Sequence, residues 1–146
     1  MTTFDFNDFR HKLKLNTRFM DIDAFGHVNN ARYLNFLEEA RISYSQEALG
    51  LFKSVDDFNV LVARIEIDFK KPIVFGEEIS IFTRVQKIGT KSFTFESVIT
   101  VANQGQFAIA ANAFQTLVTV DITNGKSIPI EASVISAIEE YEKNQA

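Results

Sequence analysis

The chain has 146 residues, 46% of them hydrophobic and 23% charged, which suits one compact domain over residues 1–146 with a buried core. A net charge of −4 argues against a nucleic-acid partner, because binding of phosphates requires a basic surface. The absence of cysteine excludes disulfides, thiolate metal sites and cysteine nucleophiles. No apolar run reaches membrane-spanning length and no secretory signal is visible, so we expect a cytoplasmic protein with no membrane partner.

A strand, a loop and a helix come first along the chain. Polar and apolar residues alternate from Leu13 to Phe19, which predicts a half-buried strand. Beyond residue 30 the apolar spacing becomes helical and continues to Leu49. Asn29 or Asn30 is the expected N-cap of this helix, and Gly50 is the expected C-cap.

Four further strands follow a loop at residues 51–59. Alternation places them at residues 64–69, 79–89, 93–101 and 107–122. In the last strand the alternation changes phase, which predicts a bulge near Ala113 and Phe114. A C-terminal helix is expected at 130–141. This order predicts an α+β fold in which a curved antiparallel sheet wraps one long central helix, with the first strand joining the sheet across the helix.

Phenylalanine is unusually frequent, at fifteen residues with no tryptophan. The excess predicts either a Phe-rich core or phenylalanines that line an apolar ligand pocket or a subunit interface.

Reactive groups concentrate in the loop from Met20 to Tyr33, between the first strand and the helix. Such loops often carry function. Asp21, Asp23 and His27 could together hold a metal ion, but nothing in their spacing requires one, so we expect no metal and no cofactor.

This loop resembles the hotdog-fold acyl-CoA thioesterases of the 4-hydroxybenzoyl-CoA thioesterase-like family. The matching residues are Arg18-Phe19, Asp21-x-Asp23-x-x-Gly26-His27-Val28-Asn29-Asn30-x-x-Tyr33 and Phe36-Leu37-Glu38-x-Ala40-Arg41. The resemblance implies the hotdog fold, hydrolysis of acyl-CoA to a carboxylic acid and free CoA, and a homodimer or homotetramer that pairs sheet edges, with acyl-CoA bound between protomers. It also implies that Asp23 is the catalytic carboxylate. Some branches carry a histidine where Asn30 stands, so His27 inherits no catalytic role from them.

Thioester hydrolysis needs a polarised carbonyl and a nucleophile or base. The first N–H groups of the helix, at about Asn30 to Arg32, are candidate donors to the developing oxyanion. Asp23 lies close enough upstream to attack the carbonyl or to activate water, and the sequence does not separate these roles. The alternative is that Asp23 only caps a turn.

The remaining candidate residues surround the substrate. Around the thioester we expect Gly26, His27, Val28, Asn29, Asn30, Ala31 and Tyr33. Gly26 is expected to supply a positive φ or a close backbone approach. His27 could act as a general acid, a ligand or a partner of the loop backbone, and Tyr33 is most simply a core aromatic. CoA is anionic, so Lys87, Lys91 and Ser92 of the turn after residue 87 are expected to bind it, with Lys70, Lys71 and Arg84 as further cations.

Three further expectations concern carboxylates. Asp21 is expected to be structural, and Glu38 to form an ion pair with Arg41 on the helix. Glu38 and Glu39 are the reserve catalytic carboxylates. The rival functions are a non-hydrolytic acyl-CoA or acyl-ligand binding protein and a hotdog hydratase or dehydratase, and the Asp-x-Asp-x-x-Gly-His loop argues against the last.

Overall fold

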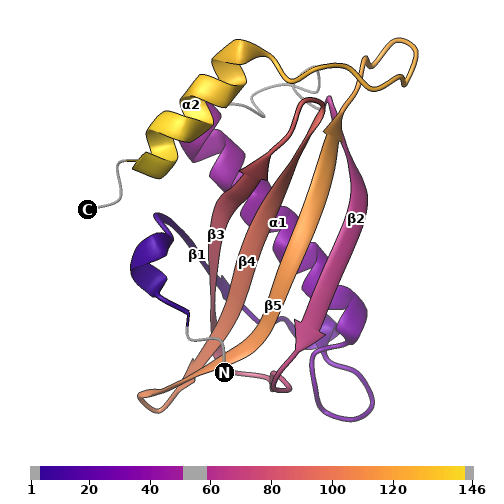
Figure 1. The fold of residues 1–146 in the computed structure, drawn as a ribbon. Coiled ribbons are helices and arrows are strands. Elements are labelled where there is room, and N and C mark those ends of the chain that lie inside the picture. Colours follow the sequence, from indigo (N-terminus) through magenta and orange to yellow (C-terminus); the bar gives the residue numbers. More distant parts are fainter. Residues whose placement is uncertain (1–3, 51–58, 144–146) are drawn as a thin grey trace.

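The computed structural model describes residues 4–50 and 59–143, in which a long helix packs against one face of a curved five-stranded sheet (Figure 1). The helices are α1, Asn30–Leu49, and α2, Ala132–Lys143. The strands are β1, His11–Asn16; β2, Val60–Phe69; β3, Glu78–Ile88; β4, Ser92–Asn103; and β5, Gln106–Thr119. Two short 3-10 helices, Phe6–Asp8 and Phe19–Asp21, flank β1. The predicted α+β class is confirmed, whereas the loop expected at 51–59 lies outside the described residues except for its last residue.

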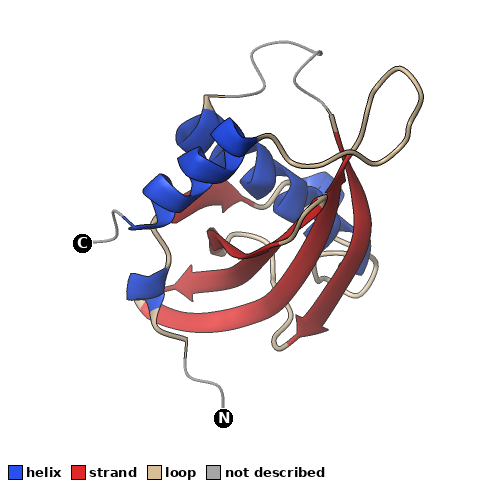
Figure 2. Cartoon of the chain, turned by 45° about the horizontal axis from the view of Figure 1, so that its top comes forward, coloured by secondary structure: helices blue, strands red, loops and turns tan. Residues whose placement is uncertain are grey.

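The sheet has the strand order β1-β3-β4-β5-β2, and every neighbouring pair is antiparallel. Strand β1 therefore joins the sheet on the side opposite β2, as expected for a strand that precedes the helix. Figure 2 shows the sheet bending around α1, with α2 beside the upper end of this helix. The two free edges are β1 and β2, and no described helix is long and apolar enough to cross a membrane.

Helix α1 begins and ends as its sequence predicts. The side chain of Asn29 accepts a hydrogen bond from the N–H of Ala31 at 2.9 Å, and Gly50 ends the helix with φ +64°. A side-chain cap typically contributes about 1 kcal/mol to helix stability. The buried stripe comprises Tyr33, Phe36, Leu37, Ala40 and Tyr44.

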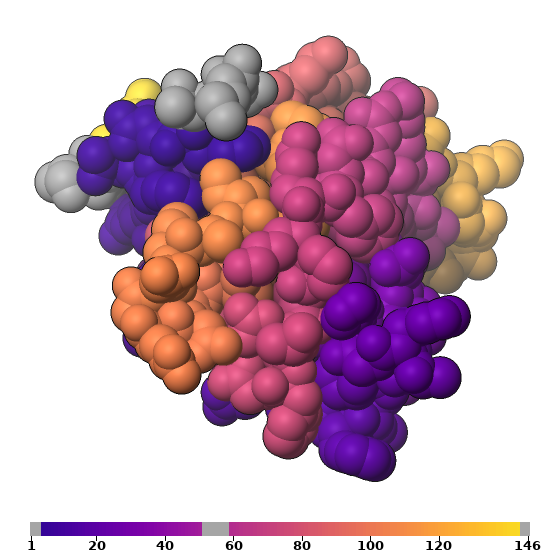
Figure 3. Space-filling model, turned by 90° about the horizontal axis from the view of Figure 1, so that it is seen from below, coloured from indigo at the N-terminus to yellow at the C-terminus, as the bar shows by residue number. Residues whose placement is uncertain are grey.

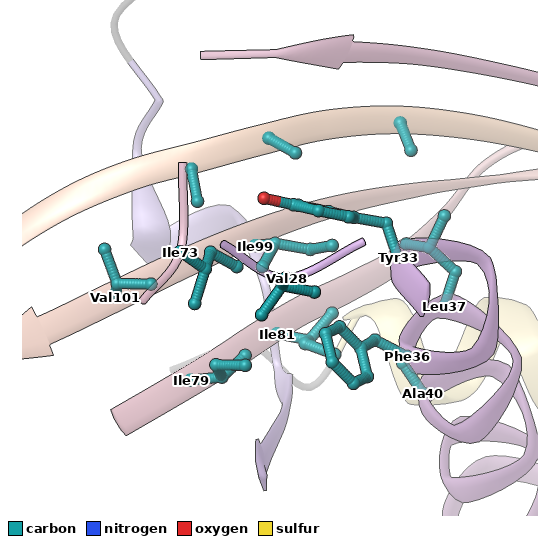
Figure 4. Packing of buried hydrophobic residues seen from close by; sticks show 13 residues of the cluster. Val28, Tyr33, Phe36, Leu37, Ala40, Ile73, Ile79, Ile81, Ile99 and Val101 are labelled. Atoms are coloured by element: carbon teal, nitrogen blue, oxygen red, sulfur yellow. The ribbon is translucent and has the colours of Figure 1, made fainter. Parts of the chain in front are cut away.

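The main core lies between this stripe and the inner face of the sheet (Figure 4). The sheet contributes Ile79 and Ile81 from β3 and Ile99 and Val101 from β4, all at most 2% exposed. Every second residue of β3 and β4 thus points its apolar side chain toward the helix, as the alternation in the sequence indicated.

The prediction of an ion pair between Glu38 and Arg41 is wrong. Arg41 is only 7% exposed and donates from Nη1 to Oε1 of Gln115 on β5 at 3.3 Å. Burial lowers the pKa of Arg41, and the charge of Glu38 partly opposes this shift. The guanidinium of Arg41 and the carboxylate of Glu38 do not come within the 4.0 Å of an ion pair. The guanidinium turns inward because position 41 belongs to the buried side of the helix.

The first strand is shorter than predicted. It ends at Asn16, and the chain then forms the 3-10 turn Phe19–Asp21, in which Phe19 is 86% exposed. The backbone N–H of Arg18 donates to Oδ2 of Asp21 at 2.8 Å, so a local cap replaces the strand ladder at this point.

The bulge in β5 lies at Ala110, three residues before the predicted place. The register of β5 against β4 shifts between Ile99 and Thr100, which leaves Ala110 without an opposite residue. Its carbonyl accepts hydrogen bonds from the N–H groups of Lys70 and Lys71, at 2.7 and 3.1 Å. The alternation in the sequence predicted the wrong position because Phe107, which precedes the bulge, lies on the outer face of the sheet. Its ring centroid there is 5.4 Å from that of Phe6.

Few of the phenylalanines that the structure describes lie in the core. In the part of the chain that the structure describes, only Phe9, Phe36, Phe93 and Phe95 are buried. Five others are exposed, namely Phe19, Phe25, Phe69, Phe75 and Phe107. The alternative, in which phenylalanines line an apolar ligand pocket or a subunit interface, stays a prediction at this point.

A buried histidine lies where α1 and α2 meet β1. His11 is 1% exposed, and its Nε2 lies 2.9 Å from the hydroxyl of Ser43. The ring of Tyr44 packs edge-on against both His11 and Tyr141 of α2. Burial lowers the pKa of His11 from its ordinary value of 6.5, and the charge of Glu47 only partly opposes this shift.

We therefore expect acid to weaken this fold through His11. Below its ordinary pKa of 6.5 the unfolded chain takes up the proton before the folded chain does. As the pH is lowered, the free energy of unfolding decreases by at most about 1.4 kcal/mol per pH unit. The decrease stops when the pH reaches the lowered pKa of His11 in the folded protein. Denaturant unfolding at about pH 7.5 and about pH 5.5 should show a larger loss for the wild type than for His11→Gln, and equal losses would contradict the assignment.

Candidate active site

The loop before α1 folds into a tight turn around Asp23. Ile22 and Val28 form an antiparallel bridge, and the N–H of Asp23 donates to the carbonyl of His27 at 2.9 Å. Gly26 has φ +80°, a conformation that glycine adopts without strain, and its N–H donates to the carbonyl of Asp23 at 3.0 Å. The predicted positive φ at Gly26 is thus confirmed.

The carboxylate of Asp23 is half-buried, and only one of its two oxygens accepts a hydrogen bond in the described part of the chain. Oδ1 accepts the N–H of Phe25 at 2.9 Å, so this side chain does cap the turn. No donor among residues 4–50 and 59–143 reaches Oδ2. A turn-capping role and a chemical role are therefore compatible, because Oδ1 holds the turn and Oδ2 accepts no hydrogen bond from the described residues.

Asp21 is fully buried and is held by two arginines. Arg18 donates to it from the backbone N–H at 2.8 Å and from Nη2 at 3.0 Å, and Nε of Arg32 lies 3.8 Å away. Burial alone would raise the pKa of Asp21, but the hydrogen bonds and charge of Arg18 outweigh it and hold this pKa below its usual range. The structure agrees with the structural role expected for Asp21.

Asp21→Asn is expected to destabilise the protein by about 2 kcal/mol, since it removes a buried charge from two arginines. Asp23→Asn provides a matched control two residues away, because its amide oxygen still accepts the N–H of Phe25 and should change stability by less than about 0.5 kcal/mol. Thermal and denaturant unfolding measure both. Equal stability of the two variants would show that the Arg18 and Arg32 contacts contribute nothing.

The start of α1 offers fewer free donors than the sequence predicts. Of the three N–H groups at Asn30, Ala31 and Arg32, that of Ala31 donates to Oδ1 of Asn29 and that of Arg32 to its carbonyl, at 2.9 and 2.8 Å. The N–H of Asn30 alone among these three has no acceptor in the described structure. Asn29 is thus an N-cap that orients the turn, and Asn30 carries the available donor.

A pocket of about 450 Å³ opens beside this turn. Its walls combine Asp23, Phe25, His27, Val28 and Asn30 of the loop with Tyr33 of α1 and with Phe69, Lys70, Lys71 and Pro72 at the end of β2. Carboxylate, donor, apolar surface and two cations therefore meet in one place. Of the residues predicted around the thioester, Gly26, Asn29 and Ala31 do not line this pocket.

Tyr33 forms the apolar back of the pocket. It is 2% exposed, and its ring stands edge-on to Phe69 with centroids 5.0 Å apart. Figure 4 shows its hydroxyl directed toward Ile73. Burial raises the pKa of Tyr33, so the phenol stays neutral at working pH. Phe69 and Pro72 were missed by the sequence reasoning, because their only signal is their position next to the loop in space. Phe25 was missed although it belongs to the loop itself.

The side chain of His27 is exposed, whereas its backbone carries contacts. Its carbonyl accepts from Asp23, and the residue forms a bridge with Val74. The predicted contact with the loop is therefore made by the main chain. No three His, Asp or Glu side chains among the described residues are close enough to hold a metal ion.

The turn that carries Lys87, Lys91 and Ser92 lies at the opposite end of the sheet from Asp23 (Figure 1). The registers place Ser92 level with Val118 and Val118 level with Leu61, at the start of β2, whereas the pocket lies at its end. Within one protomer, the residues expected to bind CoA are thus separated from the residues expected around the thioester. The cations beside Asp23 are Lys70 and Lys71.

The contact between Ser43 and His11 is not a second hydrolytic site. A serine nucleophile requires a histidine that is oriented by an acid through its other nitrogen. Nδ1 of His11 is buried without a hydrogen-bond partner among the described residues.

Residues 17–138 of the chain match the thioesterase-like superfamily. The long-chain acyl-CoA thioesterase FadM of Escherichia coli (strain K12) is 32% identical over 132 residues, which cover 89% of this chain and 98% of that protein. A thioesterase of Thermus thermophilus, solved in complex with coenzyme A and Zn, is 30% identical with a TM-score of 0.80, covering 95% of this chain and 98% of its own. A 4-hydroxybenzoyl-CoA thioesterase mutant with 4-hydroxybenzoyl-CoA bound has a TM-score of 0.78 at 17% identity, over 88% and 97% of the chains, which shows a shared fold.

Proposed function

Because the chain belongs to the thioesterase-like superfamily, we propose that it hydrolyses acyl-CoA thioesters with Asp23 as the catalytic carboxylate. Family membership makes the chain a thioester hydrolase of the hotdog fold, as the Asp-x-Asp-x-x-Gly-His loop indicated. Acyl-CoA as the substrate class is supported by the relative that acts on long-chain acyl-CoA and by the similar structure that binds coenzyme A.

One observation carries the assignment of the carboxylate. Asp23 keeps one oxygen free at the wall of a pocket that also holds Asn30, whose N–H has no described acceptor. A thioester carbonyl seated there would meet a donor at the positive end of the α1 macrodipole. Asp23 would then act in one of two ways. As a nucleophile it would expel CoA thiolate and form a mixed anhydride, which water hydrolyses to the carboxylic acid and the free Asp23 carboxylate. As a base it would take a proton from the attacking water, and that proton would pass to the leaving CoA thiolate.

The cations at the pocket suit the anionic part of the substrate. Lys70 and Lys71 line the wall beside Asp23 and are exposed. Charge-assisted hydrogen bonds from lysine to phosphate are stronger than neutral ones. These two lysines therefore replace Lys87 and Lys91 as the cations that the same protomer offers.

The distant turn becomes relevant in a dimer paired through β2. Of the two free edges, β1 has only six residues, whereas β2 has ten and exposes Leu61 and Val62 beside the charged Arg64, Glu66 and Asp68. A long free edge offers more unpaired backbone groups to a partner strand than a short one. A two-fold axis that pairs two copies of β2 antiparallel would bring Lys87, Lys91 and Ser92 of the partner subunit to the end of β2, where the pocket opens.

A thiol-release screen over short, long and aromatic acyl-CoAs tests the proposal. Release of CoA thiol that saturates with one substrate group is the expected result. The alternative function, a non-hydrolytic acyl-ligand binder, is favoured if an acyl-CoA saturates the protein, as measured by calorimetry, and none of the series is cleaved.

A further inference from the structure

Arg32 lies in the first turn of α1, a position at which the helix itself does not stabilise a cation. The positive end of the helix macrodipole is at the N-terminus, so acidic side chains are favourable there and basic ones are not. Helix α1 has no acidic residue in its first turn and carries Arg32 instead. Departures from a local preference of this kind are expected at functional sites.

The charge of Arg32 is matched by Asp21. Nε of Arg32 lies 3.8 Å from Oδ1 of Asp21, and the Asp21 side chain is 0% exposed, whereas that of Arg32 is 35% exposed. The backbone carbonyl of Asp21 also accepts the N–H of Asn29 at 2.8 Å. Asp21 therefore holds the start of α1 at two points, through its carbonyl to Asn29 and through its carboxylate to Arg32.

Asn30 lies between these two points. Its N–H has no acceptor among the residues that the structure describes, and it is the donor of the proposed site. The Asp23 carboxylate belongs to the same loop, two residues after Asp21. A change in the orientation of the first turn would therefore move the donor of Asn30 relative to this carboxylate.

The other contacts of the loop end before this turn. Figure 3 views the molecule from below and shows the purple loop against the pink segment that follows β2, where the carbonyl of Ile73 accepts the N–H of Val28 at 2.8 Å. Beyond Val28, every described hydrogen bond or ion pair that joins residues 29–32 to a segment other than α1 ends at Asp21. The orientation of the turn thus depends on Asp21 and on the side chain that pairs with it.

We propose that Arg32 is a positioning residue for the reaction, because its pairing with Asp21 sets where the Asn30 N–H lies relative to the Asp23 carboxylate. The proposal rests on the proposed function, since this geometry matters to the rate only if both groups act on a thioester. A displacement of about 1 Å at a reacting group can lower a rate about a hundredfold, so an ion pair that adds little stability can still have a large effect on kcat.

Arg18 provides the comparison, because it holds the same carboxylate from outside the helix. It donates to Asp21 from its backbone N–H at 2.8 Å and from Nη2 at 3.0 Å, both closer than the 3.8 Å of Arg32. Loss of the Arg18 side chain should therefore reduce stability more than loss of the Arg32 side chain. For kcat the order should be reversed. The backbone of residue 18 still holds Asp21 in Arg18→Gln, whereas Arg32→Gln removes the described contact between the carboxylate and α1.

Thiol release by the wild type, Arg32→Gln, Arg32→Lys and Arg18→Gln tests the proposal. Arg32→Gln should lower kcat about tenfold and change the affinity for a non-hydrolysable thioether analogue by less than about twofold. Arg32→Lys should recover most of kcat, because it keeps the charge that faces Asp21. Arg18→Gln should lower kcat less than Arg32→Gln does, although denaturant unfolding should show that it is the less stable of the two. The proposal is overturned if Arg32→Gln turns over as fast as the wild type, or if the loss of kcat follows the loss of stability.

Amide hydrogen exchange, followed by NMR, tests the same geometry without substrate. The N–H of Asn29 donates to the carbonyl of Asp21, and the N–H of Ala31 donates to Oδ1 of Asn29. Both should exchange about fivefold faster or more in Arg32→Gln, and less so in Arg18→Gln. Unchanged exchange in Arg32→Gln overturns the positioning role even where the wild type hydrolyses acyl-CoA. A wild type that releases no thiol from any acyl-CoA refutes the proposed function itself, and the positioning role falls with it.

Discussion

Asp23→Asn is expected to lower kcat for acyl-CoA hydrolysis about a thousandfold while leaving substrate affinity within about threefold of the wild type. The amide can still accept the N–H of Phe25, which Oδ1 accepts at 2.9 Å, so the turn should keep its shape. What it loses is a negative oxygen able to attack the thioester or to take a proton from water. Thiol release measures kcat, and calorimetry with a non-hydrolysable thioether analogue measures affinity.

Hydrolysis that is unchanged in Asp23→Asn would show that another group does the chemistry. Glu38 and Glu39 would be the next carboxylates to test, although both are exposed on α1 and neither lines the pocket beside Asp23. If the activity is lost as expected, rapid quenching within a single turnover separates the two roles of Asp23. A peptide that carries both Asp23 and the acyl mass identifies the nucleophile, and its absence during product formation identifies the base.

Hybrid dimers should recover activity if each site uses both protomers. Asp23→Asn is expected to be inactive, and the double variant Lys87→Gln with Lys91→Gln is expected to bind acyl-CoA weakly. The turn that carries these lysines lies far from Asp23 in its own protomer, so a shared site takes the lysines from one chain and Asp23 from the other. When the two mutant chains pair through β2, one site of the hybrid collects both defects and the other collects none. About half of the wild-type activity per hybrid dimer is therefore expected.

The measurement uses differently tagged chains that are co-expressed, purified through both tags and assayed by thiol release. Leu61→Lys on the β2 edge serves as a control, since a charge there should prevent pairing and yield smaller particles in light scattering. A hybrid no more active than its parents would place both groups in the same protomer's site. A stable dimer of Leu61→Lys would remove the β2 edge from the interface.

Much of the fold was predictable because local patterns decide it. The stripe from Tyr33 to Tyr44, the cap at Asn29 and the end of α1 at Gly50 all follow from side-chain spacing and glycine conformation. The bulge at Ala110 was misplaced because it depends on hydrogen bonds from Lys70 and Lys71, which follow the end of β2 and are distant in the sequence. A two-residue period says which side chains share a face but not which face is buried.

The sequence by itself determined the family, the strand and helix order, and the loop in which Asp23 stands, because these depend on neighbours within a few residues. Only the tertiary structure decided that Asp21 is buried against Arg18, that Asn30 holds the free N–H, and that Phe69 and the two lysines complete the pocket. It also separated Lys87 and Lys91 from Asp23 by the length of the sheet. The physical reason is that a site forms where segments distant in sequence meet, and their meeting is governed by strand register and burial rather than by any local pattern.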